Sequence, residues 1–332
     1  MSLMNKNINK IAIVRLSALG DIVNSAIVLQ FIKEKYPLAK IEWFTENSFA
    51  NILNNLCEID TIRTINLKKV KKEKNFQLLI STIKALQKYD NYDIIIDMQG
   101  LLKSSIVSRL LGKNTHGFDK SSIREPIASF FYKTTTSIPY QEGVVLRNCK
   151  IVSDALGFDI DRDMILNKKP IFNITKIYEH KKRSIAFVIG ASWSSKIYPK
   201  ELVCNVCNEL KEDVTIIWGN EDEKERAEWI SQHSKYAKVA PKLSLDELVS
   251  YISSISLLIG NDTGPTHMAW AQNIPSITLF GPTNSRMIYQ TPVNIAIESP
   301  SKVNILKINK EDFSIKEIDV FTIVKIAKEL LK

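Results

Sequence analysis

The stretch that most constrains the fold is an apolar run, residues 255–259, that stops at a polar turn and restarts as a helix. Such a short, Ile- and Leu-rich run is typical of a buried strand. In the turn, Thr263 suits a helix cap, Pro265 suits the first helical turn, and Gly264 leaves room for a ligand beside the backbone. The free N–H groups of such a helix start attract phosphate. A second strand and turn, ending at residues 281–283, follow at once, which predicts a ligand site at the carboxyl ends of parallel strands.

Strand-like and helix-like patterns alternate along both halves of the chain. At 332 residues the chain exceeds the comfortable size of one hydrophobic core. We therefore predict an α/β protein with two Rossmann-like domains, each a doubly wound parallel sheet. The periodicity fades before a buried strand restarts at residue 185. The predicted parts are an N-terminal domain (1–160), a linker (161–183), a C-terminal domain (184–315) and a final amphipathic helix (316–332).

Several patterns that bind nucleotides or metals are missing. No two glycines stand two positions apart, which excludes the G-x-G-x-x-G dinucleotide fingerprint, and neither G-K-[ST] nor H-E-x-x-H occurs. Cys204 and Cys207 share one face of a predicted helix and have no second pair of ligands, so we expect structural cysteines. The sequence predicts neither a metal site nor a cofactor.

The formal net charge of +9 calls for an anionic partner. Zinc-finger, RNP and bZIP patterns are missing, which argues against nucleic acid and leaves anionic lipid and phosphorylated small molecules. No apolar run approaches the roughly 18 residues that span a bilayer. We expect a cytoplasmic protein.

Polar residues follow the predicted strands of both halves. Asp21 opens a helix predicted over 21–35, directly after a strand and a turn, where it suits a helix N-cap or a general base. Residues 68–74 hold five lysines and one acid, which form either a solvated face or a clamp for an anionic acceptor. In the second half, the strand from residue 185 ends at a hydroxyl-rich loop with Ser192 and Lys196.

In their order and spacing, these motifs resemble the ADP-heptose heptosyltransferases of lipopolysaccharide core synthesis, which form glycosyltransferase family 9. The resemblance runs from about Ile11 to Thr283. The stretches that carry it are Ser17-Ala18-Leu19-Gly20-Asp21, the run from Asp97 to Ser104, Arg124-Glu125-Pro126, Lys196 with Pro199, Trp218-Gly219, Asp262-Thr263-Gly264 with His267, and Gly281-Pro282-Thr283.

The resemblance implies a GT-B fold, in which two Rossmann-like domains face a central cleft. The first domain is then expected to take the acceptor and the second the nucleotide sugar, with the final helix (316–332) packing back on the first. It further implies an inverting, metal-independent transfer of L-glycero-D-manno-heptose from ADP-heptose to Kdo of Kdo-lipid A. The expected partners are these two substrates and, peripherally, the inner face of the inner membrane of a Gram-negative bacterium.

The resemblance also assigns roles to residues on the donor side and to the base. Asp21 corresponds to the family's general base, and Lys196 with the helix start at Thr263 and Gly264 is expected to stabilise the departing ADP. Ser192 would donate a hydroxyl hydrogen bond. Glu223 would bind the ribose, or it is a helix acid favoured by the dipole. Asp262 would accept from heptose hydroxyls or orient the loop, and His267 faces either the ligand or the sheet.

On the acceptor side, a Kdo carboxylate and lipid A phosphates call for cations. The expected acceptor-binding residues are Lys69, Lys72, Gln99, Lys103 and Arg124. Two alternatives stay open. One is another heptosyltransferase of the family with a different acceptor. The other is a non-catalytic module that binds a nucleotide sugar, which would need Lys196 and Asp262 but not Asp21.

Overall fold

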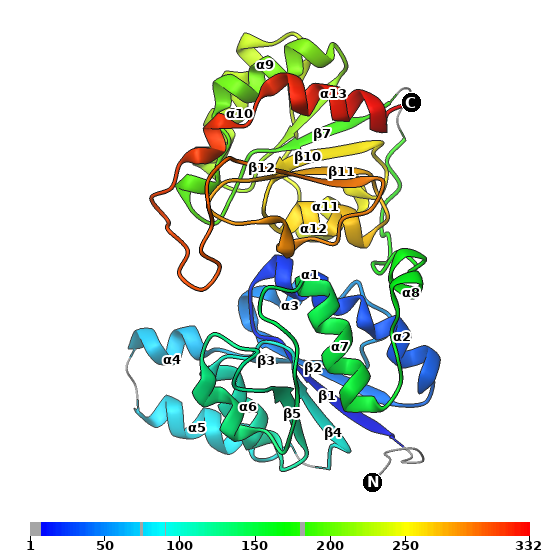
Figure 1. Cartoon of the computed structure of the whole chain (residues 1–332), viewed down its shortest axis with the longest axis vertical. Helices are drawn as coiled ribbons and strands as arrows, with labels where there is room; N and C mark the ends of the chain where they lie inside the picture. The colour runs from blue at the N-terminus through cyan, green and yellow to red at the C-terminus, as the bar shows by residue number, and fades with distance from the viewer. Residues whose placement is uncertain (1–7, 74–75, 90, 180–182) are drawn as a thin grey trace. The chain divides into compact units, whose positions relative to one another are not determined.

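The computed structural model describes residues 8–73, 76–89, 91–179 and 183–332. The chain forms two compact units, Met1–Ile171 and Phe172–Lys332 (Figure 1). Each unit is built on its own six-stranded sheet, and all the pairings between named strands are parallel. Residues 180–182 of the predicted linker lie outside the described part.

The sheet of the first unit has the strand order β3-β2-β1-β4-β5-β6. Its strands are β1 (Lys10–Val14), β2 (Lys40–Glu46), β3 (Thr61–Ile65), β4 (Ile94–Asp97), β5 (Thr115–Phe118) and β6 (Thr134–Thr136). Its helices are α1 (Leu19–Ala26), α2 (Val28–Lys35), α3 (Ala50–Leu53), α4 (Leu67–Glu73), α5 (Phe76–Leu86), α6 (Leu102–Leu111), α7 (Val144–Leu156) and α8 (Arg162–Leu166), with the 3-10 turns η1 (Asn47–Phe49) and η2 (Pro126–Phe131). Figure 1 shows α5 and α6 on one side of this sheet and α2 and α7 on the other.

The sheet of the second unit has the order β12-β11-β10-β7-β8-β9. Its strands are β7 (Ile185–Val188), β8 (Val214–Ile217), β9 (Ala237–Val239), β10 (Leu257–Asn261), β11 (Ser276–Phe280) and β12 (Asn294–Glu298). Its helices are α9 (Lys200–Leu210), α10 (Glu221–His233), α11 (Leu245–Ile252), α12 (Gly264–Ala271) and α13 (Val320–Leu330), with the 3-10 turns η3 (Ser194–Lys196), η4 (Ser285–Met287) and η5 (Ser314–Glu317). Helices α9, α10 and α13 lie on one side of the sheet, and α11 and α12 on the other (Figure 1).

The central strands are apolar on both faces because helices cover both faces of each sheet. All four residues of β7 and all five of β10 are buried. The strand order reverses between β1 and β4 in the first unit and between β7 and β10 in the second. Connections leave a doubly wound sheet in opposite directions at such a point, so a crevice opens at the carboxyl ends of those strands. Asp21, Gln99, Lys196 and Asp262 follow these four strands.

The position of the final helix differs from the prediction. The expectation that residues 316–332 pack back on the first domain is wrong. Ile323, Val324, Ala327 and Leu331 belong to the hydrophobic core of the second unit, together with residues of α9 and β7. The apolar stripe of α13 is buried there because α9 presents a matching apolar face. Cys204 and Cys207 of α9 lie in the same core, and burial raises the pKa of the Cys207 thiol to about 12, as suits packing residues.

Candidate active site

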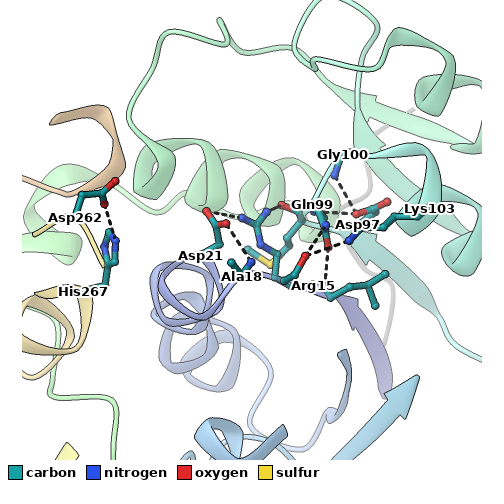
Figure 2. A network of polar contacts seen from close by, with 12 residues as sticks. Arg15, Ala18, Asp21, Asp97, Gln99, Gly100, Lys103, Asp262 and His267 are labelled. Carbon is teal, nitrogen blue, oxygen red and sulfur yellow. Dashed lines mark hydrogen bonds and ion pairs between the residues drawn. The ribbon is translucent and has the colours of Figure 1, made fainter. Parts of the chain in front are cut away.

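Asp21 lies in the first turn of α1, at the carboxyl end of β1. It is the third helical residue rather than the N-cap, a position that Ala18 takes in extended conformation. One carboxylate oxygen is 2.9 Å from the Arg15 guanidinium, and the other accepts from the Ala18 N–H at 3.2 Å (Figure 2). The Asp21 side chain keeps 26% of its exposure. The carboxylate is thus oriented from two sides and still open to a ligand.

The residues after β4 join this cluster. The Gln99 side chain accepts from the Leu16 N–H at 2.8 Å and donates to the Ser17 hydroxyl at 3.3 Å. The Lys103 ammonium donates to the same hydroxyl at 3.2 Å (Figure 2). Burial lowers the pKa of Lys103, the nearby cations Lys68 and Arg15 lower it further, and Glu46 opposes them. The structure therefore brings Asp21, Gln99 and Lys103 to one crevice, between β1 and β4.

Asp97 holds the turn after β4 in place, a role that the sequence did not predict. It is fully buried, and its carboxylate accepts from the N–H groups of Gln99 and Gly100 at 2.8 and 3.2 Å and from the Tyr132 hydroxyl at 2.8 Å. Burial outweighs these hydrogen bonds and raises the pKa of Asp97. Gly100 has a φ of +66°, and a Cβ there would lie 2.8 Å from the Ile123 side chain, so the turn requires glycine.

Arg15 is the second residue that sequence reasoning missed. Its guanidinium donates to the Met98 carbonyl as well as pairing with Asp21. Only 7% of the residue is exposed, so the position is held by packing. The sequence signal for the pair with Asp21 was an arginine at the end of a strand with an acid six residues later. The contact with Met98 could not be read from the sequence, because the sheet decides which residues after β1 and β4 lie together.

The other expected acceptor residues do not join the cluster. Lys69 and Lys72 are exposed on α4, and Lys69 faces Glu73 at 3.8 Å. Arg124 is also exposed, but its neighbour Glu125 accepts from the Leu102 N–H at 2.8 Å, which fixes this loop to the start of α6. Lys74 of the lysine run lies outside the described residues. Within the part of the chain that the structure describes, no hydrogen bond or ion pair joins Lys69, Lys72 or Arg124 to Asp21.

In the second unit, Asp262 follows β10 and is the centre of a buried polar group. Its carboxylate accepts from the Lys196 ammonium at 2.5 Å and from the Thr283 hydroxyl at 2.8 Å, and its other oxygen is 3.3 Å from His267 Nε2. Figure 2 shows the His267 ring directed at this carboxylate. Burial alone would raise the pKa of Asp262, but Lys196 and His267 outweigh it and hold that pKa well below its usual range.

This geometry bears on two of the alternatives that the sequence left open, the roles of His267 and Asp262. His267 faces the loop carboxylate and is 3% exposed. Asp262 orients the loop by holding Lys196 and Thr283, the second of which comes from the turn after β11. The Lys196–Asp262 ion pair also lowers the net positive charge at this point, because the Asp262 carboxylate balances the charge of the Lys196 ammonium.

Helix α12 starts where the sequence predicts, but the hydroxyl that bonds the backbone of its first turn belongs to Thr266 and not to Thr263. Thr263 is the N-cap residue and its own side chain makes no capping bond. Thr266 supplies the hydroxyl, which donates to the Thr263 carbonyl at 2.7 Å and accepts from the Thr263 N–H at 3.4 Å. The Asn261 side chain accepts from the Tyr198 N–H at 3.0 Å and donates to the Gly190 carbonyl at 3.3 Å, which holds the loops after β7 and β10 together.

Glu223 reaches the same edge of the sheet from the first turn of α10. It is 9% exposed and accepts from the Gly219 N–H at 2.7 Å and the Asn220 side chain at 2.8 Å. A Cβ on Gly190 would lie 2.5 Å from the Glu223 carboxylate, so the loop after β7 passes directly beside it. Ser192 is exposed on this loop. The donor-side residues that follow β7, β8 and β10 thus meet at the carboxyl ends of these three strands.

The two crevices differ chemically. The first presents a half-open carboxylate beside amide and ammonium groups, which suits proton transfer and the binding of polyhydroxyl groups. The second presents a helix N-terminus, a lysine and a carboxylate near two glycines, which suits a nucleotide with its phosphates. Within the described ranges, no cluster of three or more His, Cys, Asp or Glu side chains is placed to hold a metal ion. No described helix is both long and apolar enough to cross a membrane.

Comparison with known families identifies the chain. The model of glycosyltransferase family 9 (heptosyltransferase) matches residues 79–312, which is more than half of the chain. The chain belongs to glycosyltransferase family 9. This agrees with the resemblance drawn from the motifs, and the protein is a glycosyltransferase of the heptosyltransferase kind.

Two curated relatives align with this chain over almost its whole length. Lipopolysaccharide heptosyltransferase 1 of Campylobacter coli is 37% identical and covers 97% of this chain and 98% of its own. Lipopolysaccharide heptosyltransferase 1 of Escherichia coli K12 is 25% identical and covers 91% and 97%. Among solved structures, the E. coli heptosyltransferase WaaC with ADP-2-deoxy-2-fluoro heptose has a TM-score of 0.79 at 23% identity, covering 96% of this chain and 99% of that one. The fold is that of a GT-B glycosyltransferase, as predicted.

Proposed function

We propose that this family 9 enzyme is a lipopolysaccharide heptosyltransferase I. It transfers L-glycero-D-manno-heptose from ADP-heptose to Kdo of Kdo-lipid A in inner-core biosynthesis, with inversion and without a metal ion. The observation that carries the choice of substrates is the likeness to lipopolysaccharide heptosyltransferase 1 of C. coli, which extends over nearly the full length of both chains. The geometry of the two crevices supports the roles that follow.

Asp21 acts as the general base on the acceptor hydroxyl. An inverting transfer needs a base on the face of the sugar opposite the departing ADP. The Asp21 carboxylate fits because Arg15 and the Ala18 N–H fix one lone pair on each oxygen, and each oxygen keeps another. The ion pair with the Arg15 guanidinium holds the carboxylate in place for the acceptor hydroxyl.

Departure of ADP is assisted by fixed positive groups in the second unit. Negative charge grows on the diphosphate as the bond to heptose breaks, so donors placed there bind the transition state more strongly than the ground state. Lys196 has three N–H donors and uses one on Asp262, and the start of α12 at Thr263 and Gly264 supplies backbone N–H groups. Ser192 is placed on the exposed loop as a further donor. These groups take the part that a divalent ion has in other transferases.

The remaining residues bind the two substrates. Glu223, held on its carboxylate by Gly219 and Asn220, accepts from ribose hydroxyls, and the Asp262–His267 pair lines the sugar side of the donor site. The expected acceptor cations and amide are Lys69, Lys72, Gln99, Lys103 and Arg124. Lys103 and Gln99 both donate to the hydroxyl of Ser17, in the turn that leads to Asp21. The exposed cations meet the lipid A phosphates at the inner face of the inner membrane. Contact with the membrane is peripheral.

The Asp21–Arg15 arrangement separates this proposal from a module that only binds a nucleotide sugar. Such a module has no use for an oriented carboxylate in the other unit. A heptosyltransferase with a different acceptor would keep both crevices and differ at the exposed acceptor residues, so acceptor choice is the point to test.

The test is ADP release by the purified enzyme from ADP-heptose, measured with Kdo-lipid A, with heptosylated Kdo-lipid A and with no acceptor. We expect release only with unmodified Kdo-lipid A, unchanged by EDTA, and a product of α configuration by NMR if the donor is the β-anomer. Release with the heptosylated acceptor alone would make the protein a later heptosyltransferase. Loss of activity in EDTA with recovery in Mg²⁺ would exclude the metal-independent mechanism.

A further inference from the structure

The Trp193 indole contacts two lysines from different parts of the second unit. Lys196, three residues on, has its ammonium nitrogen 5.1 Å from the centre of the ring. Lys310, from the connection between β12 and η5, has its ammonium nitrogen 5.0 Å from the same centre. The two nitrogens are therefore at most about 10 Å apart. Cations bind the face of an indole ring in this distance range.

The connection that carries Lys310 is fixed at its base beside the donor crevice. We refer to residues 299–313 as the 299–313 loop. The Ser299 hydroxyl lies 2.8 Å from the Ser314 hydroxyl and also donates to the Gly281 carbonyl at 3.3 Å. Gly281 opens the turn that holds Thr283, whose hydroxyl bonds Asp262. A Cβ on Gly281 would lie 2.7 Å from the Ile315 side chain, so this turn and η5 are in close contact.

The two lysines differ in whether a carboxylate balances their charge. The Lys196 ammonium is 9% exposed and bonded to Asp262, whose carboxylate is 3% exposed. Lys310 is exposed and forms no ion pair with any residue of the described ranges. Asp312, two residues on, is occupied by the Ser301 hydroxyl and the Ser314 N–H. Of the two cations beside Trp193, Lys310 is therefore the one whose charge is not balanced by a carboxylate.

We propose that Lys310 is a second cation for the diphosphate of the donor, held beside Lys196 by the Trp193 ring. The inference rests on the proposed function in taking a nucleoside diphosphate sugar as the ligand of this crevice. A diphosphate carries more negative charge than the paired Lys196 balances, and the growing charge on the departing ADP increases the demand. Trp193 keeps the flexible Lys310 side chain over the crevice before the ligand arrives, which reduces the entropy lost on binding.

The test is calorimetric binding of ADP and of AMP to the full-length protein and to three variants. Lys310→Met removes the charge and keeps most of the length of the side chain. Lys310→Arg keeps the charge and the contact with the ring. Lys307→Met removes an equal charge from an exposed position of the same loop. Thermal melting of each variant checks that the fold is unchanged.

We expect Lys310→Met to weaken ADP binding about tenfold, since a hydrogen bond to a charged group is lost. AMP, with one phosphate fewer, should be affected less, and the salt dependence of ADP binding should become shallower. Lys310→Arg and Lys307→Met should bind ADP within about twofold of the wild type. Wild-type ADP affinity in Lys310→Met, or an equal loss in Lys307→Met, would overturn the inference.

These outcomes are separate from the choice of acceptor, because ADP binding is measured without one. If Lys310→Met loses ADP affinity while the wild type fails to use Kdo-lipid A, the proposed acceptor is wrong and the role of Lys310 stands. If transfer to Kdo-lipid A is seen and Lys310→Met binds ADP normally, only the role of Lys310 fails.

Discussion

Two carboxylates, each beside the point where the strand order of its sheet reverses, have different environments, and this difference assigns their roles. Asp21 follows β1 and keeps 26% exposure next to one guanidinium. Asp262 follows β10, is 3% exposed, and is bonded to Lys196, Thr283 and His267. An oriented, half-open carboxylate can accept a proton from a ligand, whereas a buried carboxylate with most of its acceptor sites occupied mainly positions its neighbours.

Replacing the proposed base tests the first role. Asp21→Ala should lower kcat about a hundred- to ten-thousand-fold, because the acceptor hydroxyl must then lose its proton to water. Affinity for ADP, measured by calorimetry, should stay near the wild-type value, since the nucleotide belongs to the second unit. Normal turnover in the variant would remove Asp21 from the mechanism, and a large loss of ADP affinity would place it on the donor side.

The second role has a consequence for stability. Asp262→Asn leaves the buried Lys196 ammonium without its counter-ion, which should cost about 3–5 kcal/mol of unfolding free energy at pH 7. The folded-state pKa of Asp262 is lowered, so its ionisation stabilises the fold above the usual carboxyl pKa, and the benefit declines as the pH falls through about 4 and below. Urea unfolding of the two proteins at pH 7 and pH 3.5 should show the difference shrinking at the lower pH.

Thr283→Val is the matched control for Asp262→Asn. It removes a single neutral donor from the same carboxylate and should cost only about 1 kcal/mol. A difference between wild type and Asp262→Asn that is equally large at both pH values would mean that the lost free energy is packing rather than ionisation.

At the scale of elements, the donor crevice depends on how closely two loops approach. The loop after β7 passes Glu223 of α10 at a distance that only glycine permits at position 190. The atoms that a methyl group would meet are the end of the Glu223 side chain, at 2.5–2.6 Å, and not backbone. A side chain of that kind can move aside at low cost to the fold, but its carboxylate then leaves the donor crevice.

Gly190→Ala should therefore raise the KM for ADP-heptose about tenfold, the effect of losing a charge-assisted hydrogen bond, with the melting temperature nearly unchanged. Gly219→Ala is the control, because a Cβ there meets the same carboxylate at 3.4 Å, an ordinary contact. Donor saturation curves for both variants measure the effect. An unchanged KM in Gly190→Ala would show that Glu223 does not contact the donor.

For the whole molecule, the +9 net charge is the feature that governs approach to an anionic acceptor. Lys69 and Lys72 are exposed on α4 of the first unit. A basic residue close to an anionic membrane contributes roughly 1 kcal/mol, and less beyond a Debye length. Replacing Lys69 and Lys72 together by Gln should thus weaken binding to vesicles of anionic lipid about tenfold at low salt and raise the KM for Kdo-lipid A, with the KM for ADP-heptose unchanged.

Equal removal of charge elsewhere controls for net charge. Lys316 and Lys325 are exposed on the second unit, and their double Gln variant should bind vesicles nearly as the wild type does. If both double variants weaken vesicle binding equally, the effect is one of net charge and the lysines of α4 are not a contact site. A loss of donor use in the α4 variant would contradict their assignment to the acceptor.

The sequence by itself determined the two Rossmann-like sheets, because hydrophobic period and turn chemistry are local properties of the chain. It also placed Asp21, Glu223 and Asp262 at the ends of strands, where ligands of such sheets bind. It did not determine what those side chains contact. The turn before α12 uses Thr266 rather than Thr263 for its hydroxyl, a choice that depends on rotamers and not on the motif.

Only the tertiary structure decided the partners. Lys196 and Asp262 are 66 positions apart, and Lys103 and Ser17 are 86 apart. Such pairs meet because the strand order reverses between β1 and β4 and between β7 and β10. The final helix shows the same limit: its sequence predicts an apolar stripe, but the surface that buries the stripe, here α9 of the second unit, is known only when the other elements are in place. Local patterns depend on backbone chemistry a few residues away, whereas a side chain's charge balance depends on groups that the fold brings to it.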